Sequence, residues 1–239
     1  MIDLHILKLR ARHPVSAEEE QAVRNVVSHV ETVPAARTLV RAGQPLEHST
    51  LLLDGLLCRY KDLKSGARQI TELHIAGDFA DLHGFTLKSL DHNLGTLTDC
   101  TIASVPHQAL AEITERFPHL ARLYWFSTNL DAAIHREWEV SLGRRTALSR
   151  LAHLFCELYI RLGIVKLTQT NGYPLPLTQT DLAECLGLTP VHVNRTLRQL
   201  RETGLVEFRD RQVIIRDLPG LRRVAEFDDR YLYLAKRDI

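Results

Sequence analysis

The spacing of apolar positions changes twice along the chain. In residues 16–31 apolar side chains recur at three- and four-residue steps, which predicts an amphipathic helix that Ser16 and Glu19 begin with a capping box. After residue 33 this period gives way to short β-rich runs between glycines mostly 11 or 12 residues apart. The runs are Thr38–Arg41, Leu51–Leu53, Leu56–Tyr60, Gln69–His74 and Ile102–Val105. The helical period returns after residue 106, so we predict an α+β chain whose first domain is a jelly-roll-like β-roll.

A long helix is predicted from Pro118, after a short one over residues 108–116. Apolar residues recur along it with the spacing of an imperfect seam, which suits a dimer interface between a β domain and a second domain. The alternative, that the stripe packs on its own domain, stays open. Gly143 is a plausible hinge, so we divide the chain into residues 1–143 and 144–239. The seam residues are Leu123, Phe126, Leu130 and Ala133.

Residues 177–204 predict two short helices joined by a tight turn. Thr178 caps the first helix, with Asp181 three residues on, and Gly187 ends it. Thr189 caps the second helix and Pro190 occupies its first position. This arrangement is typical of a helix-turn-helix, although an ordinary helical hairpin is the alternative.

The second of these helices is predicted to be amphipathic. Val193, Leu197 and Leu200 are expected to face the core. Residues 205–208 and 212–215 predict a hairpin, a wing beside the helix pair. Outward side chains near the start of a recognition helix reach base edges, where Arg bonds guanine and Asn or Gln bonds adenine. The candidate DNA-binding residues are Thr178, Thr189, Val191, His192, Asn194, Arg195, Arg198, Gln199, Arg209 and Arg211.

The net charge of the chain does not indicate DNA binding, but the distribution of charged residues does. The net charge is +1. Residues 144–239 contain 16 Lys and Arg against 11 Asp and Glu, a balance of +5, whereas residues 1–143 contain 14 against 18, a balance of −4. The basic excess therefore lies with the helix-turn-helix, as phosphate binding requires.

The four cysteines, Cys58, Cys100, Cys156 and Cys185, form no CxxC pair, which argues against a zinc ribbon and a disulfide scaffold. Cys58 lies beside Arg59, which would favour a redox-sensitive thiolate, and a buried inert thiol is the alternative. The N-terminus lacks the form of a signal peptide, and no run approaches the roughly 18 apolar residues of a membrane span. We expect a cytoplasmic protein with no membrane partner.

Four polar residues in the β-rich region, His74, Asp81, His83 and His92, are candidate ligands of a metal or a haem. The alternative places them at turns and core edges, and we predict no metal site and no cofactor. The rival function is a cupin-like metal-dependent enzyme. Neither a His-x-His pair nor an HExxH motif is found, so we expect no enzyme.

The order of helix, β-roll, long helix and winged helix-turn-helix resembles the Crp/Fnr family of bacterial transcription regulators. The resemblance spans about residues 20–215 and is most specific over 177–215. It implies a homodimer that binds inverted-repeat double-stranded DNA, senses a signal in its β-roll and contacts RNA polymerase. It also implies that Arg195 binds a guanine. Well-studied members carry Glu at the position of Val191, so the half-site is expected to differ from the standard one.

The resemblance also suggests an effector pocket. Members that bind cyclic AMP use a Gly-Glu pair and an Arg-Ser or Arg-Thr pair, which Gly77-Asp78 and Lys88-Ser89 approximate by an ungapped count. Counting back from Cys100 places Leu90-Asp91 at the second pair instead. Neither choice offers the planar fork of Arg that phosphate prefers, so cyclic AMP is not the expected effector. Members with an iron–sulfur cluster need N-terminal cysteines, which are absent here, and a ligand-independent regulator is the remaining alternative.

Overall fold

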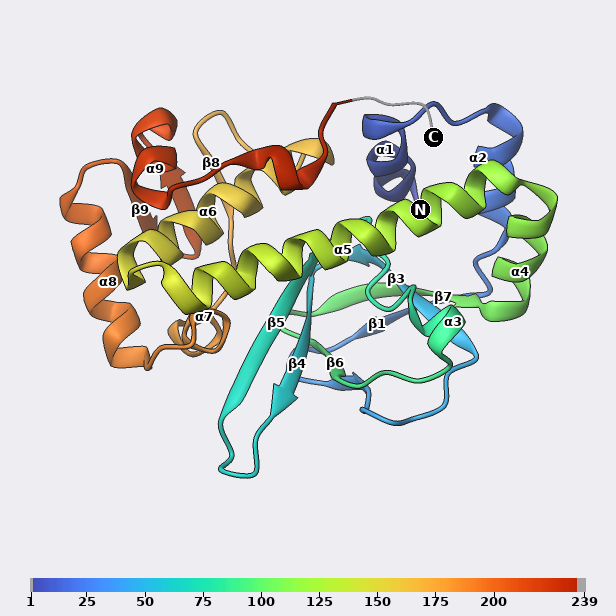
Figure 1. Cartoon of the computed structure of the whole chain (residues 1–239), viewed down its shortest axis with the longest axis horizontal. Helices are drawn as coiled ribbons and strands as arrows, with labels where there is room; N and C mark the ends of the chain where they lie inside the picture. Colours follow the sequence, from blue (N-terminus) through green and yellow to red (C-terminus); the bar gives the residue numbers. More distant parts are fainter. Residues whose placement is uncertain (1, 236–239) are drawn as a thin grey trace.

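The longest element of the computed structural model, which describes residues 2–235, is helix α5 (Pro118–Arg144). It runs along the molecule from a group of N-terminal helices, past the β-roll, to the C-terminal helices α6 to α9 (Figure 1). Pro118 stands in the first turn, where its missing N–H removes no helical hydrogen bond. In the described range no helix, α5 included, combines the length and the apolar character needed to cross a membrane.

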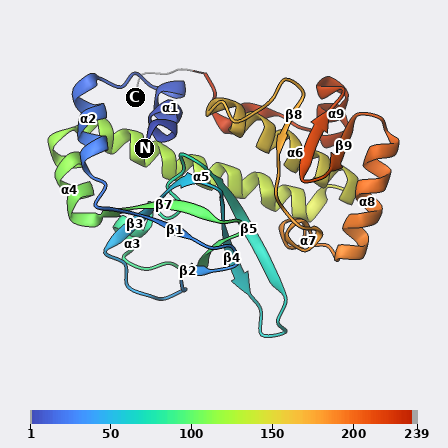
Figure 2. The same cartoon turned by 180° about the vertical axis from the view of Figure 1, so that it is seen from behind.

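The β-roll consists of two antiparallel sheets, as the α+β prediction required. β4 and β5 lie nearer the viewer in Figure 1, and β1 and β7 lie nearer in Figure 2. One sheet has the order β1 (His29–Val33), β7 (Cys100–Pro106), β3 (His48–Asp54), and the other β2 (Thr38–Val40), β6 (Asn93–Thr96), β4 (Leu56–Asp62), β5 (Arg68–Ile75). Between them the roll core contains Val40, Leu52, Leu57, Ala80, Leu90, Leu94, Cys100 and Ile102.

The N-terminal region differs from the prediction in two places. The capping box of Ser16 and Glu19 is present, but helix α2 (Ala17–Asn25) ends six residues early and His29–Val33 forms β1, paired with β7. Helix α1 (Asp3–Arg12) was not predicted at all. With the short α3 (Gly84–Leu87), helix α4 (His107–Arg116) completes the helices of this half.

Helix α1 is held by apolar contacts on one side of the roll. Ile2, Ile6 and Leu9 recur at helical spacing and pack with residues of α2, α4 and the first half of α5. Leu123 of α5 belongs to this same buried cluster. Because α1 and the roll cover that side of α5, Leu123 is not available to a second copy of the chain.

The predicted dimer seam is therefore wrong in part. Leu123 and Ala133 are buried within the chain, and Phe126 packs edge-on against His13. Leu130 packs half-buried against the C-terminal core. The side of α5 that remains exposed carries other residues, namely Arg122, Trp125, Asn129, Ala132, Arg136, Glu139, Val140 and Gly143.

The C-terminal unit is a helical group with a three-stranded sheet of order β8-β10-β9. Its elements are α6 (Ala147–Ile164), β8 (Gly172–Pro174), α7 (Gln179–Leu186), α8 (Pro190–Glu202), β9 (Val206–Arg209), β10 (Gln212–Ile215), α9 (Leu218–Ala225) and a 3-10 turn, Asp229–Leu232. Its core is continuous with apolar residues of β4 and β5, including Cys58, Tyr60 and Leu73. The roll and the C-terminal unit thus share buried surface.

Candidate DNA interface and effector cavity

The helix-turn-helix has the predicted caps. The Thr178 hydroxyl oxygen accepts a hydrogen bond from the Asp181 N–H at 3.1 Å, and the Asp181 carboxylate accepts one from the Thr178 N–H at 2.7 Å. Gly187 ends α7 with a φ of 61°, a conformation that costs glycine little. The Thr189 hydroxyl accepts from the His192 N–H at 3.2 Å, and Pro190 begins α8. These caps fix where α7 and α8 start.

Helix α8 divides into the two predicted faces. Val193, Thr196 and Leu200 are buried, and Leu197 is half-buried. The exposed ridge consists of Val191, Asn194, Arg195, Arg198 and Gln199, with His192 half-buried at its edge.

Two arginines on this ridge differ in their partners. The Arg195 guanidinium forms no hydrogen bond or ion pair with any residue in the range 2–235, whereas Arg198 donates to Glu202 at 3.0 Å. An exposed, unpaired guanidinium near the start of a helix keeps its planar fork of donors for an outside acceptor. Arg195 therefore has the geometry that base reading requires.

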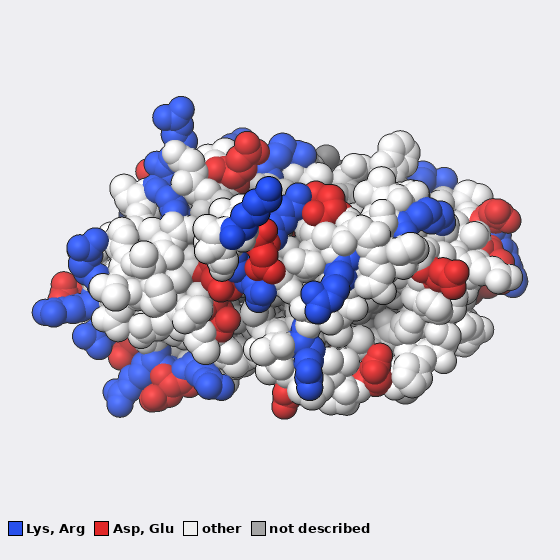
Figure 3. Space-filling view, turned by 90° about the horizontal axis from the view of Figure 1, so that it is seen from below, with Lys and Arg blue, Asp and Glu red and all other residues white. Residues whose placement is uncertain are grey.

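The wing follows α8 as a tight hairpin. Arg209 pairs with Gln212 across it, and Asp210 and Arg211 take positive φ values of 50° and 59°. Two consecutive positive φ values form the turn that matches the twist of a two-residue hairpin. Arg209 and Arg211 are both exposed at this tip, and Arg209 pairs with Asp210 at 3.2 Å. Figure 3 shows Lys and Arg side chains protruding at the end of the molecule that carries α8.

The effector pocket predicted from Gly77, Asp78, Lys88 and Ser89 is not formed. A Cβ on Gly77 would lie 2.9 Å from the Leu4 carbonyl, because α1 packs directly on this turn. The Asp78 carboxylate pairs with Lys8, and with Arg161 at 3.1 Å.

Lys88 and Ser89, the other two residues of the predicted pocket, make different contacts. The Lys88 ammonium lies 5.0 Å from the centre of the Phe85 ring, and Ser89 forms a β-bridge with Pro45. Neither side chain lines the large cavity of this region. The prediction failed because it rested on residue order and did not include α1.

An open cavity of about 790 Å³ lies instead between the roll and α5. Arg59 and Lys61 of β4 line one side, His83 and His92 line another, and Asp131 and His135 line the side formed by α5. Ala132, Glu139 and Gly143, from the exposed side of α5, also line it. A ligand held here would touch both the roll and α5.

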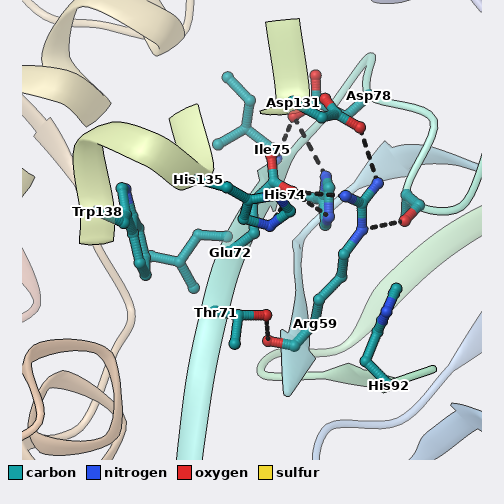
Figure 4. Close-up of polar contacts among 12 residues, drawn as sticks. Arg59, Thr71, Glu72, His74, Ile75, Asp78, His92, Asp131, His135 and Trp138 are labelled. Carbon is teal, nitrogen blue, oxygen red and sulfur yellow. Dashed lines mark hydrogen bonds and ion pairs between the residues drawn. The ribbon is translucent and has the colours of Figure 1, made fainter. Parts of the chain in front are cut away.

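The cations of the cavity are already paired. Arg59 donates to Glu72 at 2.7 Å, to Asp131 at 2.8 Å and to the Ala80 carbonyl at 2.8 Å (Figure 4). Lys61 donates to Asp91 at 2.7 Å. A cyclic phosphate would have to displace these carboxylates, so the cavity does not favour it.

Two acids share Arg59, and they differ in pKa. Burial raises the pKa of Asp131 to about 6, and the charge of Glu72 adds to this effect. Burial opposes ionisation of Glu72 as well, but Arg59 and His74 hold its pKa below the usual range. Like charges on one cation cannot both ionise freely, so Glu72 keeps its charge and Asp131 is the acid that takes up a proton first.

Two histidines of the cavity, His83 and His92, are neutral near pH 7. Burial, and then the charge of Arg59, lower the pKa of His83 to about 3, and burial lowers the pKa of His92. Their rings lie 5.3 Å apart. Asp81 does not join them, because it accepts hydrogen bonds from the backbone and hydroxyl of Thr50. Across residues 2–235 no three or more His, Cys, Asp and Glu side chains are placed to hold a metal ion.

The cysteines are inert by position. Cys58, Cys100, Cys156 and Cys185 are all buried free thiols. Burial raises the pKa of Cys58 to about 12, so the neighbouring Arg59 does not make it a thiolate. The redox interpretation of Cys58 is wrong, and the interpretation as a buried inert thiol is confirmed.

A buried ionic cluster between the roll and α6 was missing from the sequence analysis. Arg161 of α6 donates to the Leu73 carbonyl at 2.7 Å and pairs with Asp78 and with Glu157 at 3.0 Å. Glu157 also accepts hydrogen bonds from Trp138 at 3.1 Å and Tyr231 at 2.8 Å. The only sequence signal was the i,i+4 spacing of Glu157 and Arg161, which does not reveal that both side chains are buried.

Both halves of the chain match known families of domains. Residues 30–117 match the model of the cyclic nucleotide-binding domain, and residues 149–224 match the Crp-like helix-turn-helix domain. The transcriptional activator protein FnrL of Cereibacter sphaeroides is 27% identical over 216 residues, which are 88% of this chain and 86% of the relative. The nitrogen fixation regulation protein FixK of Azorhizobium caulinodans is 28% identical over 215 residues, with the same coverage of 88% and 86%.

The fold has a close counterpart among solved structures. FixK2 from Bradyrhizobium japonicum superposes with a TM-score of 0.72 at 24% identity, covering 83% of this chain and 97% of the other. The regulator CLP of Xanthomonas campestris superposes with a TM-score of 0.66 at 15% identity, covering 84% and 99%. The arrangement of roll, long helix and helix-turn-helix is thus that of both structures.

Proposed function

The chain belongs to the Crp/Fnr family of bacterial transcription regulators, and from that premise we propose how its own residues bind an operator, pair two copies and receive a signal. Members of this family bind DNA as dimers. We assign residues 1–143 to sensing and dimerisation and residues 144–239 to DNA binding. The observation that carries the DNA assignment is the unpaired Arg195 guanidinium on the exposed ridge of a correctly capped α8.

Helix α8 enters the major groove in this proposal. Arg195 bonds guanine O6 and N7, and the neighbouring ridge residues contact bases or backbone nearby. The N-termini of α7 and α8 present backbone N–H groups to phosphates beside Thr178 and Thr189. The wing adds phosphate contacts from Arg209 and Arg211. The ridge residues with supporting roles are His192, Arg198 and Gln199.

Two copies pair through the exposed side of α5. Trp125, Ala132 and Glu139 stand seven residues apart, as do Asn129, Arg136 and Gly143. Two rows with this repeat form the seam of a parallel helix pair, which would present two α8 helices about one DNA turn, ~34 Å, apart. This seam replaces the one expected at Leu123 and Ala133.

The signal enters through the cavity between the roll and α5. Its wall and the dimer seam share Ala132, Glu139 and Gly143, so a ligand there alters the packing of two copies directly. The paired states of Arg59 and Lys61 support an effector other than cyclic AMP. The protein acts on transcription rather than as an enzyme, in the cytoplasm, where bacterial DNA is found. It contacts RNA polymerase, a proposal supported by relatives named as transcriptional activators.

The test compares base reading with backbone binding. An operator is first selected from a random DNA pool, and binding of Arg195→Ala is then measured on it and on single-base variants over several salt concentrations. Loss of one bidentate contact costs about 1–3 kcal/mol of discrimination at one base pair per half-site. If Arg195→Ala weakens every sequence alike and lowers the salt dependence, the residue binds phosphate and the assignment is wrong.

A further inference from the structure

The most exposed large apolar side chain between residues 2 and 235 is Val191, at 82%. It is the second residue of α8, directly after Thr189 and Pro190. Single exposed apolar residues are common on protein surfaces. Val191 differs because it stands in line with Asn194 and Arg195, on the ridge that faces DNA.

The spacing places Val191 beside the base that Arg195 reads. Residues three and four apart share one side of a helix, so Val191 is a neighbour of both Asn194 and Arg195. Four residues of helix rise about 6 Å, and base pairs follow one another at about 3.4 Å. Val191 therefore contacts an edge within about two base pairs of the guanine.

Only one base offers Val191 a favourable edge. The valine side chain has no donor or acceptor, and in the major groove only thymine presents a methyl group. Opposite cytosine, the valine would cover the N4 amino group without accepting its hydrogen bond, which is unfavourable. Val191 thus favours thymine over cytosine.

Asn194 supplies the polar half of the same recognition. Its side-chain amide donates to the Gln179 Oε1 atom at 3.4 Å, and Gln179 is the first residue of α7. This contact ties the amide to the neighbouring helix, and within residues 2–235 its oxygen and its second N–H form no other hydrogen bond. An asparagine amide with one acceptor and one donor available bonds adenine N6 and N7.

We propose that Val191 and Asn194 together specify an A·T base pair within about two base pairs of the guanine bound by Arg195. Val191 contacts the thymine methyl and Asn194 bonds the adenine. The inference rests on the proposed DNA contacts of α8 and adds to them the identity of a second base pair.

The experiment removes single groups from the DNA. In the selected operator each thymine of a half-site is replaced by uracil, which lacks only the methyl group, and affinity is measured by fluorescence anisotropy. At one thymine position, replacement by uracil in a single half-site is expected to lower the affinity of the protein for the operator about fourfold. The same replacement in both half-sites is expected to lower it about fifteenfold. Val191→Ala keeps only the Cβ methyl, so the difference between its affinities for the thymine and uracil operators should be smaller than in the wild type.

A second arm tests the adenine. Replacing it by 7-deazaadenine removes the N7 acceptor and should weaken the wild type about fivefold, but leave Asn194→Ala unchanged. Val191→Glu should shift the preference at the paired position toward cytosine, because a carboxylate accepts from N4. Leu87→Ala is the matched control, an exposed apolar residue at 63% on α3, which should respond to uracil like the wild type.

The possible results distinguish a failure of the A·T assignment from a failure of the proposed DNA-binding function. Wild-type affinity that no uracil replacement lowers, or a uracil effect as large in Val191→Ala as in the wild type, overturns the inference and leaves the proposed function intact. A protein that selects no sequence at all overturns the proposed function and the inference with it. Because Val191 is exposed, a folding defect in Val191→Ala is not expected, and its melting temperature checks this.

Discussion

Replacing Arg161 by Met tests whether the roll and the DNA-binding unit are held together by buried charge. Arg161 is 4% exposed, and its guanidinium contacts Asp78 of the roll and Glu157 of α6. Met preserves much of the aliphatic volume of Arg and removes only the charge and the hydrogen bonds. The change therefore isolates the ionic contribution.

The expected loss of stability depends on the two acids that Arg161 no longer neutralises. Asp78 keeps Lys8 as a partner, but Glu157 is left fully buried, and among residues 2–235 only Trp138 and Tyr231 still donate hydrogen bonds to it. Removing one member of a buried ion pair costs about 3–5 kcal/mol because the other charge is uncompensated. Arg161→Met should lose that amount of unfolding free energy.

Urea denaturation at pH 8 and pH 5.5 measures the loss. Burial already raises the pKa of Glu157, and without Arg161 it rises further, so protonation relieves part of the cost at the lower pH. The loss should be smaller at pH 5.5 than at pH 8. The double variant Glu157→Gln/Arg161→Met should recover part of the stability, since no buried charge remains.

Arg116→Ala is the control, because it breaks an ion pair with Glu18 in which both side chains are 71% exposed. That pair is worth well under about 1 kcal/mol. A loss in Arg161→Met no larger than in Arg116→Ala, or a double variant less stable than Arg161→Met at both pH values, would refute the argument.

Four further predictions follow from the structure. Ala132→Glu, on the exposed side of α5, should give monomers with much weaker operator binding, and a fully dimeric variant in analytical ultracentrifugation would reject this seam. Calorimetry should detect no micromolar binding of cyclic AMP, because Arg59 and Lys61 are paired with acids. Arg211→Ala at the wing should weaken binding to all sequences alike and lower the salt slope by about 1, whereas loss of preference at one base pair would assign the residue to base reading. Burial, and then the charge of Arg145, lower the pKa of His153 to about 3. As the pH falls below 6.5, this histidine therefore binds a proton in the unfolded chain but not in the folded one, and the folded state loses stability. His153→Phe should remove about 2 kcal/mol of the stability loss between pH 6.5 and 5, and denaturation curves with an unchanged pH dependence would contradict this.

The helix-turn-helix was predictable because its signals are local. Thr178, Gly187 and Thr189 act through hydrogen bonds and dihedral angles within a few residues of themselves, and all three have the predicted roles. The buried and exposed faces of α8 follow from a period of 3.6 residues. Such features do not depend on what the rest of the chain does.

Two strands of the roll could not be predicted from short-range sequence patterns. β1 was missed because its burial does not alternate, so the sequence carries no period-two pattern, and its place is set by pairing with β7 about seventy residues away. β6 contains Gly95, whose Cβ would lie 3.0 Å from the Tyr60 ring, so close packing rather than strand propensity selects that residue. Both strands are determined by partners that a window of neighbouring residues does not contain.

Helix α1 accounts for part of the failure of both the predicted pocket and the predicted seam. Helix α1, which the sequence did not predict, covers both Gly77 and the side of α5 that carries Leu123. Ile2, Ile6 and Leu9 did carry the helical spacing. What no spacing shows is where a helix packs, and that contact decided which pocket remained open.

The buried charges explain why the roll, α5 and α6 form one body. Arg59 pairs with Glu72 within the roll and with Asp131 of α5, and Asp78 of the roll pairs with Arg161 of α6. Between these pairs lies His74, 3.8 Å from Glu72 and 4.0 Å from Asp78, and burial lowers its pKa. Each acid faces a cation or an imidazole, and the end members sit on different elements. Sliding one element against another would leave a buried charge without its partner, at a cost of several kcal/mol.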